Sequence, residues 1–88
     1  MEKLDWLTRG ICHHIRERRI ALGLSQEELS RRSGLHRTYL SDMERGERNI
    51  SLKNLQRVAA ALETCPSQMV LIAEQHGNLV AAAAKDEP

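Results

Sequence analysis

The chain has 88 residues, enough for one small domain but too few for two independent hydrophobic cores. Its 41% apolar and 28% charged residues are typical of a folded globular domain and exclude a disordered or membrane-embedded chain. No apolar run approaches the roughly 20 residues that cross a bilayer, and the first residues do not resemble a secretory signal. We therefore expect a cytoplasmic protein.

The formal net charge of +1 is distributed unevenly along the chain. Residues 16–57 contain ten basic and six acidic side chains, a net of +4, whereas residues 58–88 contain one basic and four acidic side chains, a net of −3. Ten of the thirteen cations are arginine, which can bind phosphate or guanine through two parallel hydrogen bonds. The middle of the chain therefore suits a nucleic acid. With only Trp6 and Tyr39 as aromatic residues, a stacking platform for single strands is disfavoured.

The two cysteines predict neither a disulfide nor a metal site. Cys12 and Cys65 lie far apart in no recognisable spacing, and a reducing compartment keeps both as thiols. Cys12 precedes His13 and His14, but neighbouring residues on a helix point about 100° apart and cannot easily chelate one ion. We expect no metal, no cofactor and no small-molecule ligand.

Apolar periodicity predicts an all-α protein of five helices, because no segment alternates apolar and polar residues as a strand would. Ile11, Ile15 and Leu22 mark a first helix that we expect to end at Gly23. Residues 1–10 form an extension or the start of this helix. The domain is expected over residues 11–76, followed by an Ala-rich fraying helix or tail over residues 77–88.

Two short helices joined by a tight turn are predicted over about residues 25–45. Ser25 and Glu28 have the spacing of a capping box, which starts a helix that reaches about residue 33. Gly34 supplies the positive φ that a sharp turn needs. The next helix runs from about residue 37 to residue 45, with Leu40 and Met43 directed inward. Its opposite, polar side carries Thr38, Ser41, Asp42 and Arg45, and we expect Arg45 to contact a phosphate or flank the DNA.

Two further helices complete the predicted domain. Ser51 caps the fourth helix, and Ile50 before the cap can pack against Leu55. Pro66 suits the first position of the fifth helix, which continues toward Gly77.

The predicted helix pair has the form of a helix-turn-helix, whose second helix enters the DNA major groove. The segment SQEELSRRSGLHRTYLSDMERGERN resembles the phage-repressor and Cro type of helix-turn-helix, also called xenobiotic-response-element regulators. Within it, HRTYLSDMERGERN is most similar to the controller proteins of restriction–modification systems. The family resemblance covers about residues 11–72, and it implies a five-helix fold, a homodimer and a partly palindromic operator.

The resemblance also assigns roles to single residues. It implies that Gln26 contacts a phosphate at the start of the second helix, and that Arg37 and Thr38 meet base edges. It implies a further DNA contact by Arg48. His36 departs from the pattern, because it occupies a cap position where Ser, Thr or Asp is usual.

Physical chemistry leaves alternatives open at these positions. Arg37 can form two hydrogen bonds with guanine or remain a solvated surface cation. Thr38 and Ser41 can contact bases or phosphates equally well. Asp42 either accepts from a cytosine amino group or restrains Arg45 or Arg37, and restraint is favoured.

Two other positions on this side of the domain have alternatives of the same kind. Tyr39 either bonds a phosphate or fills space against the second helix. Gln26 either contacts a phosphate or simply belongs to a capped helix.

Arg19 and Glu44 are charges on otherwise apolar faces of the first and third helices. A partly buried ion pair between them explains both, and it resembles a pairing of the phage-repressor family. We expect Glu44→Ala to destabilise the fold and not to alter sequence preference.

The fifth helix has more apolar surface than a thin monomer can bury. Its four consecutive apolar residues are a candidate two-fold interface or part of the monomer core: Met69, Val70, Leu71 and Ile72.

The sequence predicts a homodimeric, sequence-specific DNA-binding transcriptional regulator, a restriction–modification controller that acts on its own promoter. The alternative is an antitoxin-type regulator whose C-terminal segment binds a protein partner. An enzyme is disfavoured because no nucleophile or carboxylate constellation accompanies a cleft.

Overall fold

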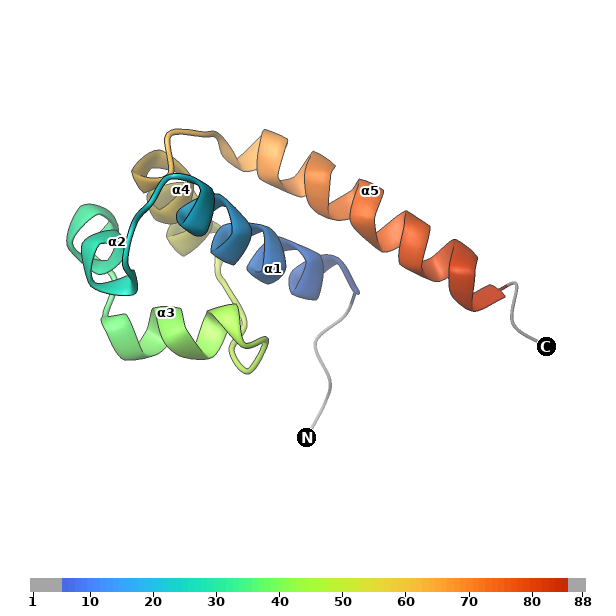
Figure 1. Ribbon diagram of the computed structural model, residues 1–88, viewed down its shortest axis with the longest axis horizontal. Coiled ribbons are helices and arrows are strands. Elements are labelled where there is room, and N and C mark those ends of the chain that lie inside the picture. The colour runs from blue at the N-terminus through green and yellow to red at the C-terminus, as the bar shows by residue number, and fades with distance from the viewer. Residues whose placement is uncertain (1–5, 86–88) are drawn as a thin grey trace.

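The computed structural model describes the backbone of residues 6–85 and the side chains of residues 6–76. The described backbone forms five helices and no strand, which confirms the all-α prediction (Figure 1). The helices are α1 (Trp6–Ala21), α2 (Gln26–Ser33), α3 (Arg37–Glu44), α4 (Leu52–Ala61) and α5 (Pro66–Lys85). Residues 1–5 and 86–88, which include parts of the predicted N-terminal extension and C-terminal tail, lie outside the described residues.

Local capping fixes the boundaries of α2. The Ser25 hydroxyl accepts a hydrogen bond from the backbone N–H of Glu28, and the Glu28 carboxylate accepts from the backbone N–H of Ser25. At the other end, Gly34 adopts a φ of 76°, a left-handed conformation that turns the chain sharply toward α3. The capping box and the glycine turn are therefore confirmed.

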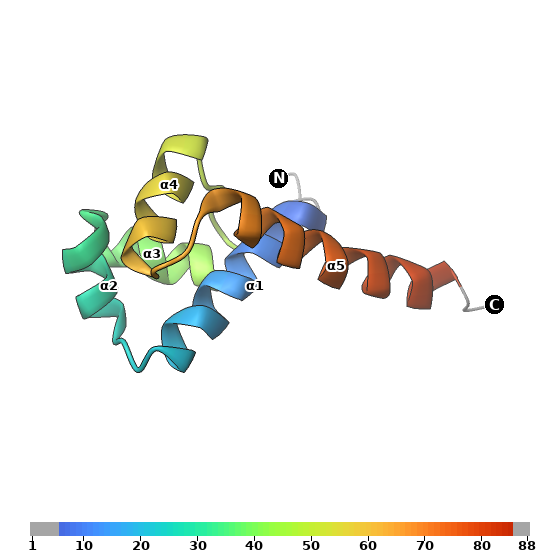
Figure 2. The same ribbon diagram turned by 90° about the horizontal axis from the view of Figure 1, so that it is seen from above.

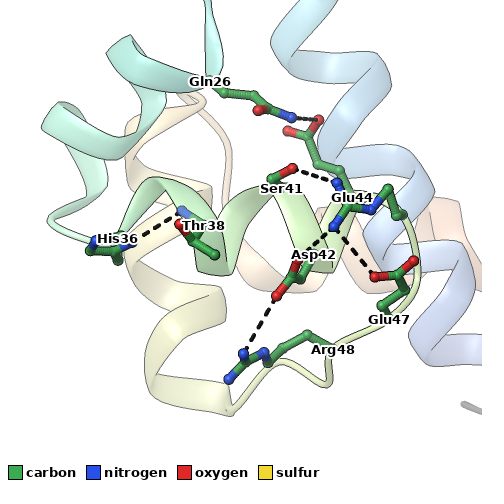
Figure 3. Close-up of polar contacts among 9 residues, drawn as sticks. Gln26, His36, Thr38, Ser41, Asp42, Glu44, Glu47 and Arg48 are labelled. Atoms are coloured by element: carbon green, nitrogen blue, oxygen red, sulfur yellow. Dashed lines mark hydrogen bonds and ion pairs between the residues drawn. The ribbon is translucent and has the colours of Figure 1, made fainter.

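The cap of α3 is the histidine that departs from the family pattern. His36 Nδ1 accepts a hydrogen bond from the backbone N–H of Thr38 at 3.1 Å, so an imidazole replaces the usual hydroxyl or carboxylate (Figure 3). The helix ends at Glu44 with Arg45 as its C-cap, one residue earlier than the sequence predicts. A turn and loop then lead to Ser51, whose hydroxyl caps α4 by accepting from the N–H of Asn54 at 3.1 Å.

The core lies between the helix-turn-helix and the helices α1, α4 and α5. Its fully enclosed large side chains come from all five helices and from the C-cap of α4: Cys12, Ile15, Leu29, Leu40, Met43, Val58, Leu62 and Met69. Leu40 and Met43 are both 0% exposed, so one side of α3 is committed to this core and the opposite side faces outward.

Helices α1 and α5 lie side by side, as both views show (Figures 1 and 2). A Cβ added at Gly10 would lie only 3.1 Å from the carbonyl oxygen of Ala73, so this glycine allows the two helices to approach closely. Helix α5 continues past Gly77 to Lys85 and projects beyond the rest of the domain (Figure 1). Alanine has the highest helix propensity, so the Ala-rich segment carries the helix beyond the isolated glycine.

None of the helices in the described part of the chain is both long enough and apolar enough to cross a membrane.

Candidate nucleic-acid interface

The outward side of α3 and the start of α2 form one continuous polar surface. Six side chains line a single open hollow of about 310 Å³, and we call them the recognition surface: Gln26, Arg37, Thr38, Ser41, Asp42 and Arg45. The sequence places four of them on the polar side of α3 or at its start and Gln26 at the start of α2, and the turn at Gly34 brings them together with Arg45. Their assignment to bases or phosphates stays a prediction.

Arg37 and Thr38 stand at the N-terminal end of α3 and are exposed. Within the described part of the chain, the Arg37 guanidinium makes neither a hydrogen bond nor an ion pair. Its five N–H donors are therefore available, and a guanine edge in the major groove could accept two of them in parallel.

The C-terminal end of α3 carries a cluster of exposed ion pairs (Figure 3). Asp42 Oδ1 accepts from Arg45 Nη2 at 2.6 Å, and Asp42 Oδ2 accepts from Arg48 Nη2 at 3.4 Å. Arg45 also donates to Ser41 Oγ at 2.8 Å and to Glu47 Oε2 at 3.3 Å. Asp42 thus restrains Arg45, one of the two predicted partners, and its second partner is Arg48 in place of Arg37.

Tyr39 is tied to the loop after α3 and to α4. Its hydroxyl donates to the Asn49 carbonyl at 2.9 Å and accepts from Asn54 Nδ2 at 3.2 Å. The single O–H donor of Tyr39 is therefore already used, and a phosphate, which offers only acceptors, could bind it only by displacing Asn49. The Arg48 guanidinium lies over the Tyr39 ring, 5.5 Å from its centre, in a cation–π contact.

A buried ion pair anchors the recognition surface to α1. Arg19 Nε donates to Glu44 Oε2 at 2.8 Å, Arg19 Nη2 donates to Glu44 Oε1 at 2.9 Å, and Arg19 Nη1 donates to the Leu24 carbonyl at 2.8 Å. The two side chains are only 13% and 3% exposed, and they meet as the sequence predicts. Gln26 Nε2 donates to Glu44 Oε1 at 3.1 Å, which fixes the Gln26 amide at the edge of the surface (Figure 3).

Sequence reasoning missed Arg16. Arg16 lies one turn before Arg19 on α1, and it lines a second hollow of about 400 Å³ together with Gln26, Ser41, Glu44 and Arg45. Its spacing of three residues from Arg19 was the available signal, because residues three apart share one helix face.

The predicted interface on α5 is divided between the core and the surface. Met69 is 0% exposed in the single chain, so its assignment to the interface is wrong: it belongs to the monomer core. Leu71 is 49% exposed, and Val70 and Ile72 are half-buried. These three residues remain candidates for a contact with a second copy.

Cys12 and His13, adjacent in sequence, have separate structural roles on α1. Cys12 is 1% exposed, and burial raises the pKa of its thiol to about 11. His13 is exposed. Its ring stacks on that of His76 of α5 with 5.3 Å between the ring centres, and its Nε2 lies 2.7 Å from Glu17 Oε1. The side chains described in the structure form no cluster of three or more His, Cys, Asp or Glu that could hold a metal ion.

The helix-turn-helix family pattern matches residues 15–71, which is more than half of the chain. The chain belongs to the helix-turn-helix family. A hypothetical transcription factor of Neisseria meningitidis serogroup B is 39% identical over 74 residues, which cover 84% of this chain and 70% of that protein.

Helix-turn-helix proteins of one functional group recur among the similar proteins. Control protein C.BamHI of Bacillus amyloliquefaciens is 47% identical over 47 residues, which cover 53% of this chain and 58% of the relative. The restriction–modification controller protein C.AhdI of Aeromonas hydrophila has a solved structure that is 44% identical, with a TM-score of 0.66 over 72% of this chain and 94% of that chain.

A second controller structure shows a protein on DNA. The restriction–modification controller protein C.Esp1396I, solved as a tetramer in complex with its natural 35 base-pair operator, is 28% identical. Its TM-score is 0.77, over 84% of this chain and 97% of that chain. The resemblance to controller proteins that the sequence suggested is confirmed.

Proposed function

We propose that this protein is a sequence-specific DNA-binding transcriptional regulator, a restriction–modification controller that binds a partly palindromic operator at its own promoter as a homodimer. Controllers at 44% and 47% identity support this function, and one similar controller is bound to an operator. They favour it over the antitoxin alternative and over catalysis. Such a regulator acts on DNA in the cytoplasm and needs no cofactor.

The observation that carries the proposal is the division of α3 into two sides. One side is buried through Leu40 and Met43, and the other presents only polar and charged side chains around one hollow. A helix that is packed on the core through one side can place its other side in the major groove, which is wide enough to admit a helix.

In the proposed complex, the free guanidinium of Arg37 binds a guanine edge and Thr38 contacts the neighbouring base. Ser41 follows one turn later on the same side, with its O–H still able to donate because its oxygen accepts from Arg45. These contacts supply the sequence dependence, each favourable base contact being worth about 1–3 kcal/mol of discrimination.

Phosphate contacts flank this group on the α1 and α2 side. The N-terminus of α2 and the second Nε2 hydrogen of Gln26 point to one phosphate, and Arg16 adds a cation beside the same hollow. At the other end of α3, Arg45 and Arg48 lie where the opposite backbone would pass. Contacts of this kind position the protein on the duplex without reading its sequence.

A dimer follows from the shortness of the recognition helix. One helix of eight residues meets too few base pairs to select a genomic site, whereas two copies about 34 Å apart meet successive turns of the same groove. We assign Val70, Leu71 and Ile72 of α5 to the two-fold contact.

The proposal is tested by selecting DNA fragments from the source genome with the purified full-length chain. Enrichment of one partly palindromic fragment upstream of the protein's own gene, beside restriction and modification genes, is the expected result. Retention of all fragments alike, or of none, would contradict a sequence-specific regulator. A selected site beside unrelated genes would overturn the controller assignment alone.

A further inference from the structure

Asp42 stands between two arginines that the proposed function places on phosphates. Each of its carboxylate oxygens accepts a hydrogen bond from a different guanidinium, Arg45 at 2.6 Å and Arg48 at 3.4 Å, so a single side chain pairs with both arginines (Figure 3). Asp42 is 22% exposed at its side chain, whereas Arg45 and Arg48 are 55% and 53% exposed. The carboxylate is therefore set back behind the two cations it holds.

The two arginines keep free donors while they are held. Arg48 uses one of its five N–H groups on Asp42, and the Tyr39 ring lies 5.5 Å beneath its guanidinium. Arg45 uses three N–H groups, on Ser41, Asp42 and Glu47, and keeps two. Both guanidinium groups are thus oriented before any DNA arrives, so that binding costs less side-chain entropy than it would for unrestrained arginines.

The same contacts lower the positive charge that a passing phosphate meets. Asp42 contributes −1 at a point shared by two cations, and Glu47 adds another −1 beside Arg45 alone. Binding to random DNA depends almost wholly on phosphate contacts, so a neutralised pair of arginines weakens it directly. On the operator, base contacts fix the register, and pre-oriented arginines meet their phosphates with less ordering cost.

We propose that Asp42 is a specificity-determining positioning residue, which orients Arg45 and Arg48 for the operator and suppresses their attraction to random DNA. The proposal rests on the proposed function. It assigns to Asp42 no contact with a base, since each carboxylate oxygen already accepts from one of the protein's own cations and the carboxylate is less exposed than either guanidinium.

The test compares Asp42→Asn with wild type on two duplexes of equal length, one random in sequence and one carrying the selected operator. Asparagine has nearly the same shape but lacks the charge. On random DNA we expect the variant to bind about three- to tenfold more tightly, the range that two exposed ion pairs can supply. The slope of log K against log salt should become steeper by about one to two, because each new phosphate contact contributes about 0.9.

On the operator, the gain in affinity is expected to be smaller, because the loss of pre-orientation offsets the gain in charge. The ratio of operator to random affinity therefore falls. Glu47→Gln is the matched control: it removes the same charge from the same surface but releases only one contact, to Arg45 at 3.3 Å. We expect less than half of the effect of Asp42→Asn from it, and in both variants a melting temperature lowered by no more than a few degrees, because exposed ion pairs contribute little to stability.

Three results would overturn the inference. Equal effects of the two variants would mean that only net charge matters. An unchanged salt slope on random DNA would mean that Asp42 does not hold the arginines back. Loss of operator affinity with random affinity unchanged would mean that Asp42 itself contacts a base. Failure of the wild-type protein to bind either duplex would overturn the proposed function as well, and so is distinguishable from the other three.

Discussion

Arg19 of α1 and Glu44 of α3 form a two-pronged ion pair, at 2.8 and 2.9 Å, that is almost completely enclosed. Glu44 Oε1 also accepts from Gln26 of α2, so three helices meet at one carboxylate. The pair holds the base of the helix-turn-helix against the first helix. It therefore links the stability of the fold to the position of the Gln26 amide at the edge of the recognition surface.

Glu44→Ala should destabilise the protein by about 3 kcal/mol, because Arg19 would remain buried with only the Leu24 carbonyl as a partner. Urea or thermal unfolding measures this loss. Arg32→Ala is the control, since Arg32 belongs to a 3.9 Å pair with exposed side chains and should change stability by less than about 0.5 kcal/mol. If Glu44→Ala unfolded at the wild-type denaturant concentration, the pair would have no structural role.

The fold could be predicted from the sequence because local signals agree with one another at most helix ends. Ser25, Gly34 and Ser51 cap or end helices through contacts with residues close by in the sequence. Each signal can therefore be recognised without knowledge of the tertiary structure. The end of α5 could not be predicted in this way. Gly77 resembles a stop, but an Ala-rich segment carries the helix to Lys85.

The residues of the candidate site could be predicted from the sequence, but most of the contacts among them could not. Helical periodicity placed Ser41, Asp42 and Arg45 on one side of α3, yet it could not show that Asp42 also reaches Arg48, which lies in a loop. Loop conformation depends on contacts such as the one from Tyr39 to Asn49, which no spacing rule encodes. The sequence also left open whether Met69 belongs to an interface or to the monomer core, because only packing decides which side of an apolar helix faces the core.

Arg37→Ala should relax base preference at one position in each half-site and leave the fold and the dimer intact. The Arg37 side chain is exposed and makes neither a hydrogen bond nor an ion pair within the described part of the chain, so its removal should cost little stability. Selection from a randomised operator library measures the change, expected to be about 1–3 kcal/mol of lost discrimination. Arg57→Ala, an exposed arginine of α4 outside the recognition surface, is the control. Unchanged selectivity of the Arg37 variant would remove this residue from the base contacts.

Gln26→Ala and Arg16→Ala should weaken binding on operator and random DNA about equally, since phosphate contacts carry no sequence information. The two variants should differ in salt dependence. Arg16→Ala should reduce the slope of log K against log salt by about one, because one fewer cation is displaced from DNA. Gln26→Ala removes a neutral donor and should leave the slope unchanged. A loss confined to the operator, for either variant, would contradict the phosphate role.

Leu71→Glu should convert the dimer to a monomer, because it places a charge in the apolar contact proposed for α5. Leu71 is 49% exposed in the single chain, so the substitution leaves the monomer core intact. Sedimentation measures the mass, and operator affinity should fall with it, since a monomer meets one half-site only. Ile20→Glu, on α1 and 55% exposed, is the matched control and should remain dimeric. Dimers of the Leu71 variant as stable as wild type would place the two-fold contact elsewhere.

The two cysteines should differ sharply in their reaction with iodoacetamide. Hydrogen bonds from the Ser67 hydroxyl and the Gln68 backbone lower the pKa of the exposed Cys65 thiol, whereas burial raises the pKa of Cys12 to about 11. Because the thiolate is the reactive form, Cys65 should react at neutral pH, with a midpoint below that of an ordinary cysteine. Ser67→Ala removes the largest cause and should shift that midpoint upward. Cys12 should react only after unfolding, and equal rates for both thiols in the native protein, followed by mass spectrometry, would contradict the burial of Cys12.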